Sequence, residues 1–365
     1  MESGIALAAE LRRHIAGGNP AGFEPLALRL FAYQYERNLP YRRFCDGRGR
    51  TPESVSSWSE IPAAPAAAFK QFPLTCAPEA SCHPDVYCRV FHSSGTTGRE
   101  TSRHFLDREA VELYRASLRV SYYHFVCPDG VRPAVAALMP PPDELPHSSL
   151  SFMLDEIVQD CGGKFYCGDK WRERLVDDLR AEAQPLVLFG TAFAWVHLHD
   201  YMNQESISFR LPDGTRVVET GGFKGRSREV SRDEMYTLFT RRLGTPATHC
   251  LSEYGMSEMA SQFYESALRD HEDGVRREPR KVALPHLLRT RVVDPVTGAD
   301  AAPGEPGLLA HYDLANLNSV LAIQTEDYGY RHPDGDGIVL LGRAPGALLR
   351  GCSLTAEEAA SSQRS

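Results

Sequence analysis

A loop rich in glycine and hydroxyl side chains, residues 92–98 (HSSGTTG), directly follows a strand-like run at 86–91. Glycine lets a backbone approach an anion closely, and hydroxyl and N–H groups donate hydrogen bonds to phosphate oxygens. The segment is not a P-loop, because it lacks the Gly-Lys-Ser/Thr ending of that motif. Its composition alone fits either a phosphate-binding loop or an ordinary polar turn.

Two later segments also combine residue types that suit nucleotide chemistry. Residues 253–258 (EYGMSE) place Ser257 beside Glu258. A hydroxyl suits a phosphate oxygen, and a carboxylate suits Mg²⁺. Residues 325–329 (TEDYG) contain Asp327, whose carboxylate could bind a ribose diol. Taken alone, the first segment also fits a helix start with a serine cap, and the second fits any acidic turn.

The elements that must position these segments follow from the apolar pattern. Strand-like runs alternate with helical runs: 107–124, 135–139, 175–183, 185–189, 216–220 and 231–243. This alternation predicts an α/β fold with a largely parallel, helix-covered sheet. After residue 286, four short strand-like pieces are separated by Gly, Pro and Asp turns: 289–293, 307–311, 319–323 and 338–341. They indicate a small β-rich subdomain.

Composition restricts the class of protein. The chain has 365 residues, 24% of them charged, and a formal net charge of -8, so nucleic acid is not expected as a main partner. No apolar run approaches the ~20 residues that cross a bilayer, and the first residues lack a signal-peptide pattern. The nine cysteines include no closely spaced pair of the kind found in zinc sites. We therefore expect a cytoplasmic protein with reduced thiols.

The three segments above, followed by Gly342-Arg343, resemble in this order the motifs of the adenylate-forming superfamily, which includes acyl-CoA synthetases and the adenylation domains of peptide synthetases. Longer stretches resemble the acyl-protein synthetases of the LuxE type, the fatty-acid-activating subunit of bacterial luminescence systems: 38–45, 61–70, 221–226 and 348–354. The resemblance covers nearly the whole chain. It implies the N-terminal domain fold of adenylate-forming enzymes, with an α/β core at 1–286, a β-rich subdomain at 287–345 and a short tail at 346–365.

The activity that the resemblance implies is ATP- and Mg²⁺-dependent activation of a carboxylic acid, expected to be a fatty acid. The acyl-adenylate would then be passed to a protein cysteine or to another acceptor. Expected partners are the acid and an acyl-accepting protein, reductase or acyltransferase. One alternative is an aryl- or acyl-acid ligase that passes the adenylate to CoA, a carrier protein or an amine. An alternative of another class is a catalytically inactive nucleotide-binding partner subunit.

Site roles carry over from the superfamily to the matching positions. The loop would hold the β- and γ-phosphates of ATP through Ser94, Gly95, Thr96, Thr97 and Gly98. The adenine base would lie against the backbone of Gly221 and Gly222 and the ring of Tyr254, which precedes Gly255.

The same resemblance assigns the remaining nucleotide contacts. Ser257 would contact the α-phosphate, and Glu258 would bind Mg²⁺ and take part in catalysis. Asp327 and Arg343 would hold the ribose hydroxyls.

Two departures from the superfamily affect the expected mechanism. The usual Pro-Lys after the loop is replaced by residues 99–104 (RETSRH), so Arg99 or Arg103 is expected to supply the missing charge, and we assign Arg103 to catalysis. Most members also continue into a mobile C-terminal domain with a catalytic lysine. We expect that domain to be absent here, because the sequence ends at Ser365. Phosphate charge would then be neutralised by Mg²⁺ and loop arginines, or by a partner.

Cys352 lies in residues 350–353 (RGCS), which resemble the site of the cysteine that accepts the acyl group in acyl-protein synthetases. The thiolate is the nucleophilic form of cysteine, and a neighbouring arginine favours it. Cys352 is therefore the expected acyl acceptor, and the alternative is an inert thiol on a terminal segment.

Overall fold

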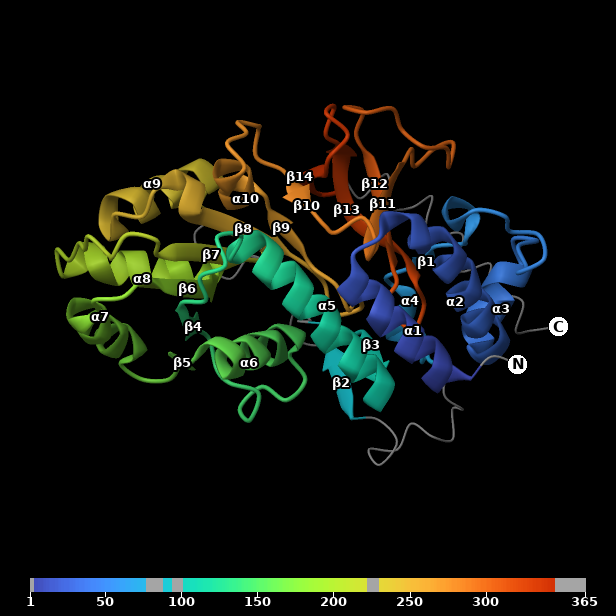
Figure 1. The fold of residues 1–365 in the computed structure, drawn as a ribbon, viewed down its shortest axis with the longest axis horizontal. Helices are drawn as coiled ribbons and strands as arrows, with labels where there is room; N and C mark the ends of the chain where they lie inside the picture. Colours follow the sequence, from blue (N-terminus) through green and yellow to red (C-terminus); the bar gives the residue numbers. More distant parts are fainter. Residues whose placement is uncertain (1–2, 77–87, 94–100, 222–229, 345–365) are drawn as a thin grey trace. The chain divides into compact units, whose positions relative to one another are not determined.

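The computed structural model describes residues 3–76, 88–93, 101–221 and 230–344. The chain forms two compact units, each assembled from segments that are separate in sequence (Figure 1). Unit 1 comprises Met1–Val120, Met256–Gln262 and Val282–Ser365, and unit 2 comprises Ser121–Gly255 and Phe263–Lys281. The division at residues 286 and 345 that we expect from the sequence stays a prediction.

Unit 2 contains the parallel sheet. In spatial order its strands are β9 (Phe263–Glu265), β8 (Cys250–Tyr254), β7 (Arg216–Thr220), β6 (Leu186–Thr191), β4 (Ala134–Leu138) and β5 (Gly163–Phe165). All neighbours are parallel except β8 and β9. The predicted α/β architecture is thus confirmed, and the runs at 135–139, 185–189 and 216–220 correspond to β4, β6 and β7.

The helices of unit 2 flank this sheet in Figure 1: α6 (Ser149–Cys161), α7 (Trp171–Ala181), α8 (Ala192–Gln204), α9 (Arg232–Leu243) and the short α10 (Ala267–Glu272). Helix α9 begins where the sequence predicts, because Ser231 Oγ accepts a hydrogen bond from the Glu234 backbone N–H (3.2 Å). It ends at Gly244, whose φ of 72° gives the left-handed C-terminal cap. Helix α5 (Arg108–Val126) belongs to both units: its residues up to Val120 are part of unit 1, and those from Ser121 are part of unit 2.

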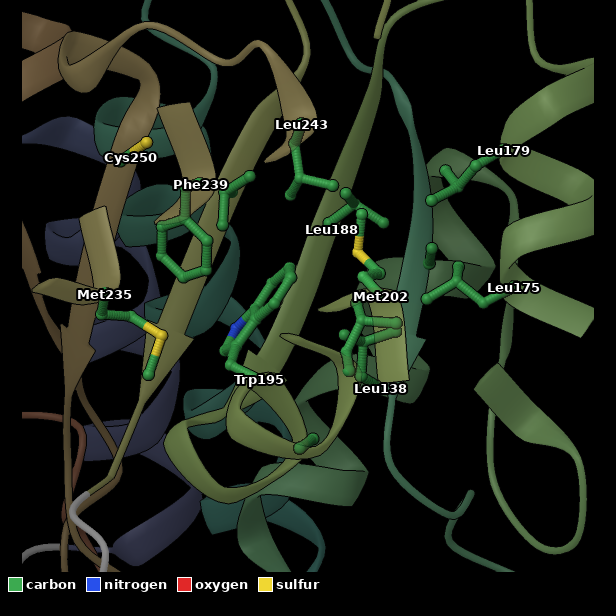
Figure 2. Packing of buried hydrophobic residues seen from close by; sticks show 14 of the residues in the cluster. Leu138, Leu175, Leu179, Leu188, Trp195, Met202, Met235, Phe239, Leu243 and Cys250 are labelled. Carbon is green, nitrogen blue, oxygen red and sulfur yellow. The ribbon is translucent and has the colours of Figure 1, made fainter. Parts of the chain in front are cut away.

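The core of unit 2 forms where α8 and α9 cover the sheet (Figure 2). Trp195 and Phe239 meet edge to face, with ring centroids 4.7 Å apart. The indole N–H of Trp195 donates to the Val218 carbonyl of β7 (3.2 Å), so this large side chain is buried without losing its polar partner. Burying each such apolar side chain contributes roughly 2–3 kcal/mol. Leu188 from β6 and Leu175 from α7 extend the same cluster.

Unit 1 contains an antiparallel sheet: β11 (Leu288–Val293), β12 (Gly307–Asp313), β13 (Ala322–Arg331) and β14 (Ile338–Arg343). The short β1 (Ala64–Pro65) pairs in parallel with β13, and β2 (Arg89–His92) forms a separate antiparallel pair with β3 (Arg103–Leu106). Unit 1 also contains the helices α1 (Gly4–Gly17), α2 (Phe23–Arg37), α3 (Leu39–Asp46) and α4 (Ala68–Gln71).

Smaller elements complete the described chain: 3₁₀ turns at Pro20–Gly22, Trp58–Glu60 and Ala247–His249, and β10 (Lys281–Val282). Among the described helices, none combines the length and the apolar character needed to span a membrane.

The segment between β12 and β13 is buried although it is not a strand. Residues 314–321 have no exposed member, so their backbone polar groups need partners inside the protein. Gln34 of α2 supplies three: its Nε2 donates to the carbonyls of Asn316 (2.7 Å) and Leu317 (3.1 Å), and its Oε1 accepts from the Leu321 N–H (2.8 Å). The predicted strand at 319–323 starts later, at Ala322, because the Leu321 N–H bonds to the Gln34 side chain instead of to a neighbouring strand.

Asn38 supports the same buried segment from the start of α3. Its side-chain NH₂ donates to the Ser319 carbonyl (3.2 Å), while its side-chain oxygen caps α3 by accepting from the Tyr41 N–H (3.2 Å). Ser319 in turn donates through its hydroxyl to the Leu74 carbonyl (2.8 Å). The N-terminal helices thus provide polar partners to a distant loop.

We predict that Gln34→Ala lowers the free energy of unfolding by roughly 2–4 kcal/mol, because three buried backbone groups lose their partners. Urea denaturation measures this loss. Glu36→Ala, at an exposed position of the same helix, is the matched control and should stay within about 0.5 kcal/mol of the unaltered protein. Equal midpoints for the two variants would contradict the proposed support of the loop.

Candidate functional site

Glu258 lies in unit 1, in the segment that leads from β8 to β9, and its side chain is buried. Ser102 Oγ donates a hydrogen bond to Glu258 Oε1. Burial raises the pKa of Glu258, while the hydrogen bond from Ser102 and the positive charges of Lys70 and Arg343 act in the opposite direction. A nearby cation stabilises the ionised form of such a buried carboxylate.

The surroundings of Glu258 are compatible with Mg²⁺. Within the described residues no group of three or more His, Cys, Asp and Glu side chains could hold a metal ion. Mg²⁺ that accompanies a nucleotide, however, is commonly held by one or two carboxylates together with substrate phosphates. A single buried carboxylate such as Glu258 fits that mode of binding.

Ser257 is fixed to both strands that flank the glycine-rich loop. Its hydroxyl donates to the His92 carbonyl at the end of β2 (3.2 Å). Its carbonyl accepts from Nδ1 of His104 on β3 (2.9 Å). Ser94, Gly95, Thr96, Thr97 and Gly98 lie outside the described residues. The structure therefore brings the two flanks of the loop to Ser257.

The flanks of the loop are also bonded to each other. The Ser93 N–H donates to the Ser102 carbonyl (3.2 Å), and the Ser102 N–H donates to Ser93 Oγ (3.1 Å). This pair of hydrogen bonds continues the β2–β3 pairing by one step and fixes where the loop begins and ends.

Asn316, which we did not predict from the sequence, is hydrogen-bonded to the Ser257–Glu258 segment. Its Nδ2 donates to the Glu258 carbonyl (3.0 Å) and to the Val320 carbonyl (2.8 Å), which fixes the orientation of the amide. Its Oδ1 then lies 2.8 Å from Nε2 of His104. Asn316 belongs to the buried segment that Gln34 supports, where apolar and polar residues are mixed (314–319, LANLNS), so no local signal in the sequence singles it out.

His104 is a second residue that we did not predict. Both of its ring nitrogens face oxygen acceptors, which favours the protonated ring. Burial is the larger effect and lowers the pKa of His104 to about 4. The Phe69 ring packs edge to face against the imidazole, with centroids 6.2 Å apart. His104 therefore acts in the structure as a fixed link between β3 and Ser257.

Asp313 secures the residues that follow Glu258. Its Oδ2 accepts from the backbone N–H groups of Ala260 and Ser261 (2.9 Å each), and its Oδ1 accepts from Ser261 Oγ (2.6 Å). The carboxylate is fully buried. Together with Asn316, it fixes the backbone from 258 to 261 against the end of β12.

Asp327 and Arg343 are register partners on β13 and β14. Arg343 Nε lies 3.2 Å from Asp327 Oδ1, and Nη1 donates to Glu326 Oε2 (2.9 Å). The Arg343 side chain is 65% exposed. The structure thus brings together the two residues expected to hold the ribose, with the guanidinium accessible to a ligand.

Arg103 is the first residue of β3 and lies between Ser102 and His104, whose side chains both contact the candidate site. Ser102 and His104 direct their side chains to Glu258 and Ser257. Because side chains alternate along a strand, Arg103 lies on the opposite face, where its guanidinium is 5.7 Å from the Phe105 ring centroid. Its assignment to catalysis stays a prediction, and Arg99 lies outside the described residues.

The expected adenine-binding residues are in unit 2. Gly221 follows β7 with a φ of 72°, and among the described residues none lies within 4 Å of where its Cβ atom would be. Tyr254 ends β8, and its ring lies 5.5 Å from that of Phe263. Gly255 follows directly, whereas Gly222 lies outside the described residues.

The two strand ends that carry Gly221 and Tyr254 are joined by a buried hydrogen bond. Thr220 and Glu253 are register partners, and Thr220 Oγ1 donates to Glu253 Oε2. Burial raises the pKa of Glu253 to about 7, with a further increase from the charge of Glu219, while the bond from Thr220 and the charge of Lys281 oppose it. We did not single out Glu253 from the sequence.

Comparison with known proteins identifies the family of this chain. The family described as acyl-protein synthetase, LuxE, matches residues 169–361, more than half of the chain. The chain belongs to the LuxE family of acyl-protein synthetases. This confirms the resemblance stated from the sequence motifs. A curated relative from Aliivibrio fischeri, a long-chain-fatty-acid–luciferin-component ligase, is 22% identical over 348 residues, covering 91% of this chain and 87% of that protein.

Solved structures show the same fold for this LuxE-family chain. An open conformation of 2-hydroxyisobutyryl-CoA ligase, in complex with 2-HIB-AMP and CoA, has a TM-score of 0.63 at 15% identity, covering 87% of this chain and 73% of that one. ATP-bound MatB from Rhodopseudomonas palustris has a TM-score of 0.52 at 18% identity, covering 81% of this chain and 55% of that one. The family and the fold make this chain an ATP-using, acyl-adenylate-forming ligase that activates an acid and transfers it to an acceptor.

The raised pKa of Glu253 predicts how the stability of the protein depends on pH. The folded-state pKa of about 7 lies above the ordinary value of 4.5, so folding favours the protonated carboxyl. The contribution is complete below the ordinary value and is lost as the pH rises through about 7. Glu253→Gln is neutral at every pH. At about pH 5 its unfolding free energy should be close to that of the unaltered protein, and at about pH 8 it should be higher by roughly 1–3 kcal/mol.

Urea denaturation at both pH values, with the exposed Glu205→Gln as control, measures this difference. A constant difference between Glu253→Gln and the unaltered protein across the pH range would show that Glu253 does not titrate there.

Proposed function

We propose that this LuxE-family ligase activates a long-chain fatty acid with MgATP and passes the acyl group to a thiol, that of Cys352. The observation that carries the proposal is the attachment of Ser257 and Glu258 to both flanks of the glycine-rich loop. This arrangement supports a site in which a hydroxyl and a carboxylate face a nucleotide whose phosphates lie in the loop.

In the first step, the carboxylate of the acid attacks the α-phosphorus of ATP. A bond forms between the acid oxygen and this phosphorus, and the bond to the β-phosphate oxygen breaks, which releases pyrophosphate. Ser257, after turning its hydroxyl from the His92 carbonyl, would donate to the α-phosphate. Glu258 would hold Mg²⁺, whose charge offsets that of the phosphates when it is bound.

The remaining contacts would orient the nucleotide. Asp327 would accept hydrogen bonds from the ribose hydroxyls, and Arg343, held against it at 3.2 Å, would donate to them. The backbone at Gly221 and the ring of Tyr254 would contact the adenine. Such contacts would hold ATP in the orientation needed for attack by the acid. Correct orientation of two bound substrates accounts for a large part of the rate increase in a two-substrate reaction.

The fatty nature of the acid is supported by the name of the Aliivibrio fischeri relative, a ligase of long-chain fatty acids. The second step would be attack by a thiolate on the acyl carbon, with release of AMP. Cys352 lies outside the described residues, so its role rests on the sequence resemblance. The described cysteines are all free thiols, which supports a location in the reducing cytoplasm.

ATP–pyrophosphate exchange across a panel of acids tests the first step. We expect exchange with long-chain fatty acids, and a loss of about 100-fold or more in Glu258→Gln, because the carboxylate that would hold Mg²⁺ is removed. Glu305→Gln, at an exposed position, is the matched control and should exchange normally. Exchange with aromatic acids alone would favour the aryl-acid alternative. Nucleotide binding without exchange for any acid would favour the inactive partner subunit.

Mass spectrometry after incubation with ATP and the preferred acid tests the second step. We expect one acyl group on the peptide that contains Cys352. Cys352→Ala should retain pyrophosphate exchange, because adenylation precedes transfer, and should lose the acylated protein. Cys88→Ser, which removes an exposed thiol, should keep both. Full acyl transfer in Cys352→Ala would exclude it as the acceptor.

A further inference from the structure

Two cations act on the buried carboxylate of Glu258: Arg343 and Lys70 of helix α4. Both lower its pKa against the larger effect of burial. Arg343 was expected at this site from the motifs. Lys70 was not, although it ends one of the stretches that resemble the LuxE family, residues 61–70.

Helix α4 is held firmly beside the site. The Ala66 N–H donates to the Gln324 carbonyl of β13 (2.9 Å), directly after the pairing of β1 with that strand. Phe69, fully buried, packs against the His104 ring, and His104 bonds to the Ser257 carbonyl. Lys70 follows Phe69 in the same short helix, so packing fixes its backbone beside His104, and its long side chain extends from that point.

The two cations differ in how far neighbouring carboxylates already neutralise their charge. The guanidinium of Arg343 contacts two carboxylates, those of Glu326 (2.9 Å) and Asp327 (3.2 Å). Lys70 is exposed to solvent. Its charge is therefore available to a phosphate, whereas that of Arg343 is largely compensated.

A third cation, Arg103, is less well placed for the same task. It stands on the face of β3 opposite to Ser102 and His104, the two residues that reach Glu258 and Ser257. Its guanidinium lies near the Phe105 ring. The geometry of β3 therefore favours a cation from another element, and α4 is the element that packs against His104.

We infer that Lys70 binds the triphosphate of ATP and stabilises the negative charge that develops on the leaving pyrophosphate, in place of the lysine missing from the loop. This inference rests on the proposed function. The ammonium donates hydrogen bonds to phosphate oxygens and keeps its proton throughout, so the bonds made and broken are those of the adenylation step alone. A lysine on a flexible stem can follow the phosphate as charge moves from the α- to the β-phosphate.

The test compares Lys70→Gln, Lys70→Arg and Arg103→Gln in pyrophosphate exchange. Lys70→Gln should lower kcat/KM for ATP by about 100-fold, the usual effect of removing one charge-stabilising donor. Lys70→Arg should recover most of that loss. Arg241→Gln removes an exposed cation of helix α9 and is the matched control, with kcat/KM unchanged. Urea denaturation of each variant separates a loss of function from a loss of folding.

A binding measurement keeps the inference testable apart from catalysis. Calorimetric titration with MgATP and with adenosine should show that Lys70→Gln weakens ATP binding about 10-fold, a loss of about 1.4 kcal/mol, and leaves adenosine binding unchanged. This result in a protein without exchange activity would support Lys70 while rejecting the proposed function. Normal exchange and ATP binding in Lys70→Gln would overturn the inference, and a loss confined to Arg103→Gln would assign the charge to Arg103.

Discussion

The candidate site depends on one constraint: a loop buried between β12 and β13 must find partners for its backbone polar groups. Residues 314–321 are buried without the regular pairing of a strand. Gln34 and Asn38, from helices nearly three hundred residues earlier, supply those partners. An unpaired buried carbonyl or N–H costs roughly 1–3 kcal/mol, so this loop keeps its shape only with the N-terminal helices in place. The loop presents Asn316, and the end of β12 beside it presents Asp313, and these two side chains fix the backbone from 258 to 261.

Charge around the EYGMSE segment follows a consistent pattern. Glu253 at its start and Glu258 at its end are both buried carboxylates whose pKa is raised by burial. Each is held by one hydroxyl, from Thr220 and Ser102 respectively. In the first case the bond ties two strand ends together in unit 2. In the second, the carboxylate stands in unit 1 among cations, which is the environment that a polyanionic nucleotide and its counter-ion need.

Local signals in the sequence were sufficient for the parallel sheet and for helix α9 with its Ser231 cap. Each of these depends on short-range periodicity or on a motif. The residues that support the site could not be found in this way. Asn316, Asp313 and His104 act through hydrogen bonds to residues far away in sequence, and a buried asparagine has no local pattern of its own. The apolar run at 319–323 predicted an earlier strand start, because a buried loop and a buried strand have the same composition.

The two hydrogen bonds between Ser93 and Ser102 have a consequence for the variability of this family. They close the chain at the base of the glycine-rich loop, so the two ends of the loop are held together. For a loop whose ends are already held together, each doubling of its length costs only about 0.6 kcal/mol in chain entropy. Insertions and deletions between these two serines therefore cost little in chain entropy. The number of residues available to surround the phosphates can change while the β2–β3 pair that holds the ends of the loop stays the same.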